Sequence, residues 1–543
     1  MTLSSRARRA RLRSARRLWR AARLAGGLGV LVGVAGCDMA PAYHPDHFVF
    51  PDNWKGEGTV RYAAPNEAAL RGDWWTLLGD PILNRLEEQA NRVNPDLQVA
   101  AETFTQARDM AAEAQAGLYP QVAASAGMGK YKASQHRLWR GHGATGPTYM
   151  SSEQYSGTAT WEPDFWSAIR NRKRMRTQQA QERAADYAVM RLSTDAELAS
   201  DYIAIRGLDV QDAVYRDSIR TYKLAVQITR MRQAGAIAAG LDVSRAENQL
   251  YATQAQETDL LARRAVLEHA IAAFVGVAPA AFHLEPESQM RFPDIGVPML
   301  LPSALLERRP DVAAAEREMA QANRAIGVSR AAFYPNVSVN AMTGFMDNGF
   351  TLADLSNSMY SYAVQAAMPL FQGGLRRAEL QRTWSQYRQA EDNYRGTVLQ
   401  AFQDVEDGLT MTGQLRAELA QQHRSVQAAM RTQGMTMALY TGGLTNYLDV
   451  VVAQIAALTA RIAEVQVETR RHQATVSLIR ALGGGWTRDQ LPSDKSIMPF
   501  SPLQYDGLRV PKEAGGIATG SGPEKLNLTG PGLAGVGLTT PAQ

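Results

Sequence analysis

The feature that most constrains this chain is one uninterrupted helical stretch from Trp166 to Ala234. It contains 69 residues with no proline and a single glycine, Gly207, and its apolar residues recur at helical spacing. A helix of that length would extend roughly 100 Å, several times the span of an ordinary globular core. The apolar residues form a narrow seam, which suits packing against another helix. The seam residues follow one another at steps of seven, four, three and four: Leu208, Tyr215, Ile219, Tyr222 and Val226.

The long helical stretch is part of a larger segment that occurs twice in the chain. A generic coiled coil does not require such a duplication. A segment that ends in Tyr-Pro at Pro120 recurs at Pro335, and the matches continue through the rest of each copy at an offset of 206 or 207. The two copies cover residues 74–280 and 281–486. A period this long indicates a tandem duplication, because solenoid repeats span only about 20 to 50 residues.

Each copy contains a predicted β-hairpin, residues 120–162 in the first and 335–369 in the second. A proline ends the preceding helix and suits the start of a strand, and apolar and polar residues then alternate with period two. Each alternating segment has about 10 or 11 residues, the length that a tilted strand needs to cross the hydrocarbon of a bilayer. Two soluble hairpins are the alternative, but they would need a core that the narrow helical seams do not supply. Aromatic residues near the strand ends are expected at the membrane interface: Tyr155, Trp161, Tyr360 and Tyr362.

The stretches after each hairpin predict an elongated antiparallel pair of helices. Long helices are expected over 166–234 and 373–440, each followed by a glycine-bearing turn and a return helix, over 241–276 and 446–482. A short helix over 303–332, and its counterpart in the first copy, would stack on the return helices to match the long ones. Four strands cannot close a barrel, and single-chain membrane barrels have at least about eight strands, so a spanning chain must oligomerise.

The first residues, 1–36, have the order of a secretory signal peptide, with nine arginines and no acidic residue ahead of an apolar core. The four residues that end at Cys37 resemble the bacterial lipobox, which implies removal of the leader and acylation of Cys37. Several acyl chains would give stable anchoring in the membrane. A cysteine lying by chance near a signal-peptidase site is the alternative. Asp38 follows the cysteine, at a position where aspartate retains some lipoproteins of enteric bacteria at the inner membrane.

Composition excludes several classes of function. Without residues 1–36 the chain has 49 basic and 53 acidic residues, a net charge of −4, so nothing indicates a nucleic acid partner. No run of 18 apolar residues follows the leader, so a helical membrane span is not expected. The single cysteine rules out an intramolecular disulfide framework. Residues 37–73 predict an extended, lipidated arm, and the proline- and glycine-rich residues 487–543 predict a flexible tail.

No catalytic or metal-binding pattern is present in the sequence. The 20 methionines are dispersed, which indicates packing residues rather than a metal path. We expect no cofactor, no metal site and no enzymatic activity. The eight histidines have no metal-ligand spacing, and we expect them at the surface: His44, His47, His136, His142, His269, His283, His423 and His472.

Four sequence blocks in order resemble one known family. The most specific block, Leu301 to Pro335, reads LPSALLERRPDVAAAEREMAQANRAIGVSRAAFYP, and it is followed by PLFQGGLRRAEL, YTGGLTNYLDVVVAQ and RALGGGW. Between about Trp74 and Trp486 the chain is similar to the TolC-like outer membrane factors, specifically their NodT/OprM lipoprotein branch. The resemblance implies a mixed α/β membrane protein and a homotrimer, in which four strands per protomer form a 12-stranded transmembrane β-barrel. The barrel would continue into a long periplasmic α-helical barrel.

The resemblance also implies partners that meet the far tip of the helices. These are a periplasmic adaptor and an inner-membrane pump of the RND type. The adaptor contacts would lie at the two turns after the long helices: Gly235, Ala236, Gly443 and Leu444. Glycines there allow left-handed conformations, although they would equally serve only to break the helices. Many relatives have an aspartate gate residue where this chain has Thr445. Asp449 or Asp242 is the alternative gate residue, and either would equally be an ordinary charge on a helix surface.

We interpret the chain as the outer membrane channel of a tripartite efflux system. It would passively conduct drugs or other small toxic compounds to the exterior, with the energy supplied by the pump. A channel for type I protein secretion shares the fold and is the first alternative. A lipid-anchored periplasmic coiled-coil adaptor is the second, although it would lack four strands with aromatic ends.

Overall fold

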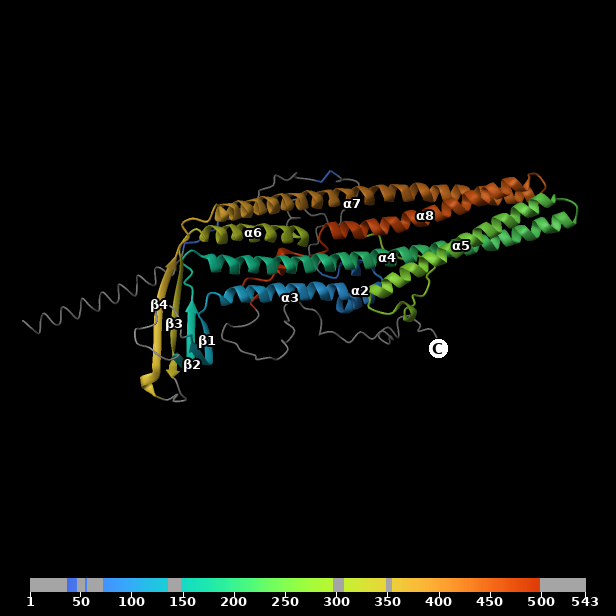
Figure 1. Ribbon diagram of the computed structural model, residues 1–543. Coiled ribbons are helices and arrows are strands. Elements are labelled where there is room, and N and C mark those ends of the chain that lie inside the picture. Colours follow the sequence, from blue (N-terminus) through green and yellow to red (C-terminus); the bar gives the residue numbers. More distant parts are fainter. Residues whose placement is uncertain are drawn as a thin grey trace, which may run out of the picture.

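A computed structural model shows an elongated body of helices with a sheet at one end (Figure 1). It describes residues 37–45, 54–55, 72–134, 148–295, 307–347 and 354–498. The expected signal peptide, residues 1–36, lies outside these ranges. In Figure 1 the strands run across the end of the helical body, and the turns between the long and the return helices lie at the opposite end.

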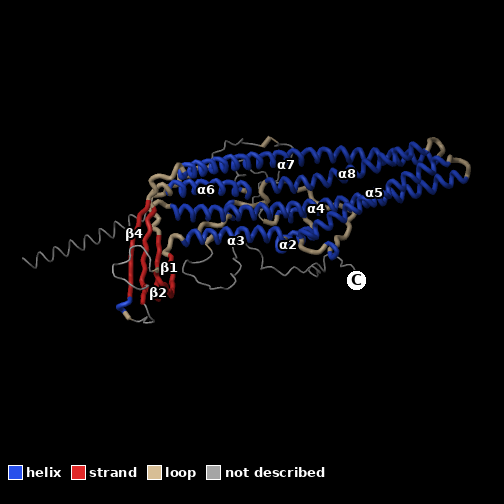
Figure 2. Tube along the Cα trace, viewed as in Figure 1, coloured by secondary structure: helices blue, strands red, loops and turns tan. Residues whose placement is uncertain are grey.

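From α3 in the first repeat and α6 in the second, the two repeats have the same order of helices and strands (Figure 2). The paired helices have equal lengths: 22 residues in α3 and α6, 67 in α4 and α7, and 35 in α5 and α8. At about 1.5 Å per residue, each 67-residue helix is roughly 100 Å long. The first repeat comprises η1 (Trp74–Leu78), α2 (Pro81–Val93), α3 (Pro95–Ala116), β1 (Gln121–Ala133), β2 (Thr148–Trp161), α4 (Ala168–Ala234) and α5 (Gly240–Phe274). The second comprises α6 (Pro310–Ala331), β3 (Asn336–Asp347), β4 (Ser358–Ala367), α7 (Leu375–Thr441) and α8 (Tyr447–Ala481). Short 3-10 turns lie at η2 (Pro279–Ala281), η4 (Leu355–Asn357) and η5 (Arg488–Gln490).

Helix α6 begins later than the sequence pattern suggested. The expected helix over 303–332 is wrong at its start, because the helix begins at Pro310 and Arg309 is extended, with φ −105° and ψ 124°. The residue before a proline avoids the helical region, and proline itself suits the first helical position because it has no N–H to leave unpaired. Residues 303–306 lie outside the described ranges.

Helix α4 is the central element of the body. It packs against α3, α5, α6 and α8, whereas α7 packs against α6 and α8. Its only glycine, Gly207, marks a close approach to α8, since an added Cβ would lie 2.3 Å from the Thr469 hydroxyl. The glycine that is otherwise unfavourable in a helix interior therefore has a packing reason.

The two largest apolar cores among the described residues hold the helices together. The larger one lies where the short and the return helices meet end to end, and residues such as Trp74, Tyr202 and Leu478 form it. The second lies near the turns and contains three residues of the expected seam, Ile219, Tyr222 and Val226. The other two seam residues, Leu208 and Tyr215, are partly buried.

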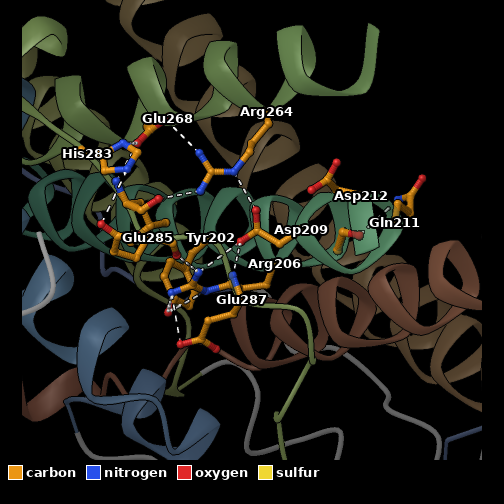
Figure 3. A network of polar contacts seen from close by, with 12 residues as sticks. Tyr202, Arg206, Asp209, Gln211, Asp212, Arg264, Glu268, His283, Glu285 and Glu287 are labelled. Carbon is orange, nitrogen blue, oxygen red and sulfur yellow. Dashed lines mark hydrogen bonds and ion pairs between the residues drawn. The ribbon is translucent and has the colours of Figure 1, made fainter. Parts of the chain in front are cut away.

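A buried network of charged residues fixes the connection that follows α5 (Figure 3). Arg206 of α4 donates to the Glu285 carbonyl at 2.7 Å, and Arg264 of α5 donates to the Leu284 carbonyl at 2.6 Å. Asp209 accepts from both arginines, at 3.1 and 2.6 Å. Because each charge has a partner, the connection is held without leaving an unpaired buried charge.

Helix α8 corrects the expectation that no segment after the leader is apolar enough to cross a membrane. By length and composition it qualifies, with a mean hydropathy of 1.5 over 18 residues, of which 44% are buried. It packs along α7 and α4. Its buried apolar residues include Val450 and Val476, which belong to the two cores.

Two further expectations are wrong. The tail is packed up to residue 498, because Ile497 is fully buried near Ala107 and Ala180, and Gln181 donates to the Pro492 carbonyl at 3.0 Å. His472 is buried, not at the surface, and burial together with the charge of Arg471 lowers its pKa to about 4. His472 lies between the polar residues Arg471 and Gln473 in the sequence, and only the packing of the helices covers it. His47, His136 and His142 lie outside the described residues.

A buried pair of carboxyl groups joins α2 to α4. Glu87 and Asp195 are 0% and 3% exposed. Burial raises the pKa of Asp195 to about 7, and burial together with the nearby Asp195 raises the pKa of Glu87 well above its usual value. Asn91 donates to Asp195 at 2.9 Å, and Arg191 lies 3.8 Å from it. Below about pH 7 the protonated form of Asp195 is therefore favoured in the folded chain.

From this pair we predict that the free energy of unfolding falls as the pH rises from about 4 to about 7. In that range the folded protein keeps a proton that the unfolded chain releases, so the stabilisation is lost with rising pH. Asp195→Asn removes the titration of Asp195 and its repulsion of Glu87, and we expect it to raise the free energy of unfolding at pH 8 by on the order of 2 to 4 kcal/mol. Thermal unfolding of the purified protein between pH 5 and 8 measures this. The control Asp242→Asn, at the tip, should keep the wild-type profile, and identical profiles for all three proteins would contradict the assignment.

Candidate functional site: the strand sheet and the helical tip

The register of the sheet decides which side chains share a face. The strand order is β1-β2-β3-β4, and all neighbours are antiparallel. Val364 lies opposite Val339, which lies opposite Trp161, and directly opposed side chains point to the same side. This side, the apolar face, comprises Val122, Ala124, Ala126, Met128, Tyr155, Gly157, Ala159, Trp161, Val337, Val339, Ala341, Thr343, Phe345, Tyr360, Tyr362, Val364 and Ala366.

The opposite side, the polar face, carries uncharged residues, most of them small or polar, together with the larger Tyr131, Met342, Met346 and Met359. Among the strand side chains that the structure describes, it carries no charge. Ser125 and Ser156 are hydrogen-bonded across it at 2.8 Å. Its members include Gln121, Ser125, Gly127, Gly129, Gln154, Ser156, Thr158, Thr160, Asn336, Ser338, Asn340, Gly344, Ser361 and Gln365. Such a surface suits contact with water.

The apolar face ends at charged residues. Lys130, Glu153 and Asp347 share its side of the sheet beyond the last apolar positions. From Val337 to Phe345 the strand extends roughly 26 Å at about 3.3 Å per residue, which is comparable with the apolar band of outer-membrane barrels. The apolar length therefore matches a membrane.

The four expected aromatic residues all lie on the apolar face. Trp161 is at the end next to the helices, whereas Tyr155 and Tyr360 lie toward the other end of the strands. Tyr360 and Tyr362 are about four-fifths exposed, at 78% and 82%. Their position at the membrane interface stays a prediction. The sequence reasoning missed Phe345, opposite Tyr155, although it continues the period-two pattern of Val337.

Among the elements that the structure describes, the sheet has two open edges. β1 pairs only with β2, and β4 pairs only with β3. Both faces of β1 and β4 are almost entirely exposed within the single chain. Unpaired edges of this length are a template for pairing with another strand.

The two tip turns have matching geometry, with one substitution. Gly443 is left-handed at φ +78°, as expected for glycine, but its counterpart in the first repeat is Ala236, at φ +57°. Gly235 has φ −79° and is the residue that ends α4, which fits the alternative that it only breaks the helix. In each turn the next amide bonds back to a helical carbonyl, Ile237 to Arg232 and Leu444 to Leu439.

Each turn presents one exposed apolar side chain. Leu444 is 78% exposed, and Ile237, at the equivalent position, is 69% exposed. Ile237 was not among the expected contact residues, although the repeat offset of 207 relates it to Leu444.

The candidate gate residues have ordinary helix-end partners. The Thr445 hydroxyl donates to the Asp449 carboxylate, and Asn446 caps the same helix by accepting from the Asp449 amide. Asp242 lies 3.7 Å from Arg245 in the first turn of α5. Acidic residues at helix starts are favoured by the helix dipole, so these contacts need no gate to explain them. A gate role for Thr445, Asp449 or Asp242 stays a prediction.

Arg232 links the two repeats at the tip, and the sequence reasoning assigned it no role. It donates to the Tyr440 and Thr441 carbonyls at 2.8 and 3.2 Å, and its guanidinium lies 4.7 Å from the centre of the Tyr440 ring. It thus donates, from the end of α4, to two carbonyls at the end of α7.

Comparison with known proteins now places this architecture in a family. A family profile described as outer membrane efflux protein matches residues 86–277 and 301–484, one block in each repeat. The chain belongs to the outer membrane efflux protein family. The family and the outer-membrane location expected from the sequence are confirmed.

Relatives of this efflux protein match it over most of their length. The pyoverdine export outer membrane protein OpmQ of Pseudomonas aeruginosa is 28% identical over 461 residues, which cover 84% of this chain and 95% of OpmQ. The toluene efflux pump outer membrane protein TtgC of Pseudomonas putida is 27% identical over 463 residues, 83% of this chain and 93% of TtgC. The solved outer-membrane channel OprN superposes with a TM-score of 0.73 at 25% identity, covering 82% of this chain and 99% of that chain.

These findings confirm the fold class, a strand sheet joined to long helices as in an outer-membrane channel. They confirm an efflux function at the outer membrane and argue against the adaptor alternative. The family and its relatives are channel proteins rather than enzymes. Among the residues that the structure describes, no group of three or more metal-ligating side chains occurs.

The two faces of the sheet predict opposite responses to the same substitution. Val364→Lys places a charge on the lipid-facing side of β4 and should cost about 2 to 4 kcal/mol near the bilayer midplane. Gln365→Lys, one residue along, faces the polar side and should be tolerated. The amount of protein assembled in outer-membrane fractions measures both variants. Equal assembly of the two variants would show that the faces are assigned wrongly.

Proposed function

We propose that this efflux protein is the passive outer membrane channel of a tripartite efflux system for small toxic compounds. The observation that supports this proposal is the sheet of four described strands, which is apolar on one face, polar on the other and open at both edges. An apolar face toward lipid and a polar face toward water describe the wall of a membrane barrel. A passive channel requires no enzymatic step.

The number of copies follows from the need for a lumen. The open edge of β1 would pair with β4 of the next copy, so that n copies make a barrel of 4n strands. Two copies would give eight strands, and an eight-stranded barrel is filled by its own side chains. Three copies give twelve, the smallest multiple of four that leaves a wider interior. We therefore propose a homotrimer with a 12-stranded barrel continued by the helices into the periplasm.

The proposed partners are those that could reach the tip of the helices. The turns lie about one long helix, roughly 100 Å, from the strands. An exposed apolar residue on each turn, Ile237 and Leu444, suits contact with a periplasmic adaptor, beside Gly235, Ala236 and Gly443. We propose an adaptor and an inner-membrane pump of the RND type as partners. We also propose acylation of Cys37, which is exposed and has no disulfide partner.

The substrate class rests on the relatives. OpmQ is named for pyoverdine export and TtgC for toluene efflux, both small molecules. In the described strands the polar face carries uncharged side chains, most of them small or polar, which favours weak contact with passing solutes over tight binding. Type I protein secretion remains the second candidate because it would use the same barrel.

A bacterial strain that lacks this protein distinguishes the two candidate functions, small-molecule efflux and protein secretion. We expect the strain to become several-fold more susceptible to small toxic compounds, and wild-type protein to restore the resistance. Unchanged susceptibility together with loss of a secreted protein from the medium would favour the secretion channel. The purified protein should also conduct ions in planar bilayers, and absence of conductance would contradict the channel.

The Arg232 link predicts a tip that is closed by a contact between repeats. Hydrogen bonds from a charged group contribute about 1.5 to 3 kcal/mol, so Arg232→Ala should raise the open population at least about tenfold. The matched control is Arg230→Ala, whose partner Glu247 lies in the same repeat at 2.5 Å. Planar-bilayer recordings measure the effect as larger or longer openings. Equal conductance of both variants and the wild type would show that this link does not restrict the tip.

A further inference from the structure

The first described residues, 37–43, are docked on the helical body. The carboxylate of Asp38 accepts from Asn171 at 2.8 Å and from Arg174 at 2.6 Å, both on α4. It also accepts from Arg324 of α6 at 3.3 Å. We call these four residues the Asp38 clamp. The clamp joins the residue after the expected lipid site to one helix of each repeat.

Further contacts align the segment along α6. The Tyr43 hydroxyl donates to Glu316 at 2.8 Å, and Asn323 donates to the Pro41 carbonyl at 3.1 Å. The partner residue number thus rises along α6 as the chain is followed back from Tyr43 toward Asp38. Since α6 ends at Ala331 and β3 begins at Asn336, Cys37 lies at the sheet-proximal end of the helices. Arg174 lies only about 9 Å from the start of α4 at about 1.5 Å per residue, which gives the same position.

A glycine makes room for this docking. An added Cβ at Gly327 of α6 would lie 2.9 Å from both the amide nitrogen and the Cβ of Ala40, and 2.8 Å from the Asn171 side chain. Glycine in a helix interior is unfavourable relative to alanine, so its presence under the segment has a packing reason.

The charges in the clamp complement one another. Burial acts to raise the pKa of Asp38, but the hydrogen bonds from Asn171 and Ala40 and the charge of Arg174 outweigh it and hold that pKa below its usual value. Asp38 is therefore ionised between two arginines. Asn171 is fully buried, so the polar contact is shielded on one side.

We propose that the Asp38 clamp positions the lipid anchor of this protein. It holds Cys37 at the ends of α4 and α6 that meet the sheet, so that the acyl chains enter the membrane leaflet beside the strands of the same protomer. Asp38 is thus a positioning residue that acts through the folded body, and not only a residue read by sorting factors. This inference rests on the proposed acylation of Cys37.

Hydrogen exchange at one amide reports the clamp directly. The Ala40 amide donates to the Asp38 carboxylate at 3.1 Å. The experiment uses the full-length protein purified from membranes into lipid nanodiscs. We expect Asp38→Asn and the double variant Arg174→Gln with Arg324→Gln each to speed exchange at Ala40 at least about tenfold. The matched control is Arg172→Gln, an exposed arginine of the same helix with no ion pair among the described residues, which should stay within about twofold of wild type.

A further variant keeps the test valid if the double variant does not fold. Gly327→Ala displaces Ala40 without removing a charge, and it should also speed exchange. Unchanged exchange at Ala40 in the double variant and in Gly327→Ala would overturn the clamp. So would relocation of Asp38→Asn to another membrane with no effect of the arginine variants, because Asp38 would then act only in sorting.

Mass spectrometry of the N-terminal peptide separates this inference from the proposal beneath it. An acylated Cys37 with faster exchange in the variants supports the positioning role. An unacylated Cys37 would overturn both the lipid anchor and its positioning, even if exchange becomes faster.

Discussion

The packing of α4 against its neighbours in both repeats is the interaction on which the rest of the structure depends. A helix roughly 100 Å long cannot be enclosed by a compact core, so it must be covered along its length by other helices. Helices α3 and α5 cover it from its own repeat, and α6 and α8 cover it from the other. Small side chains permit the close approach that dense packing requires. The buried ones on α4 include Ala180, Ala184, Ala185, Ala196, Ala199 and Gly207.

An elongated body of this kind leaves its sheet without cover. Exposing the apolar face to water would be unfavourable by about 25 cal/mol for each Å². The two open edges add unpaired backbone groups. Lipid would satisfy the first requirement, and further copies of the chain in the proposed trimer would satisfy the second. The membrane and the oligomer are thus consequences of the same shape, because helices that stand end-on to the sheet cannot fold back over it.

Polar side chains from elsewhere in the fold satisfy the helix ends. The last carbonyls of a helix have no partner within it. Arg232 satisfies the end of α7, and Arg309 donates to the Ala481 carbonyl at the end of α8 at 2.9 Å. Asn94 donates to the Phe274 carbonyl at the end of α5 at 3.3 Å. These contacts come from a different element in each case, so they fix the stacking of the helices as well as their length.

The sequence by itself determined the elements and their duplication. The spacing of prolines, the period of apolar residues and the repeat offsets are local signals, and they located the long helices and the two faces of the sheet within a few residues. Only the tertiary structure decided which distant residues meet. Glu87 meets Asp195, Arg232 meets Tyr440, and Ile497 is buried under α3 and α4, although nothing in their neighbouring residues indicates it. The reason is physical: a periodic pattern shows which side of an element is apolar, whereas burial, pKa and pairing depend on which other element lies against that side.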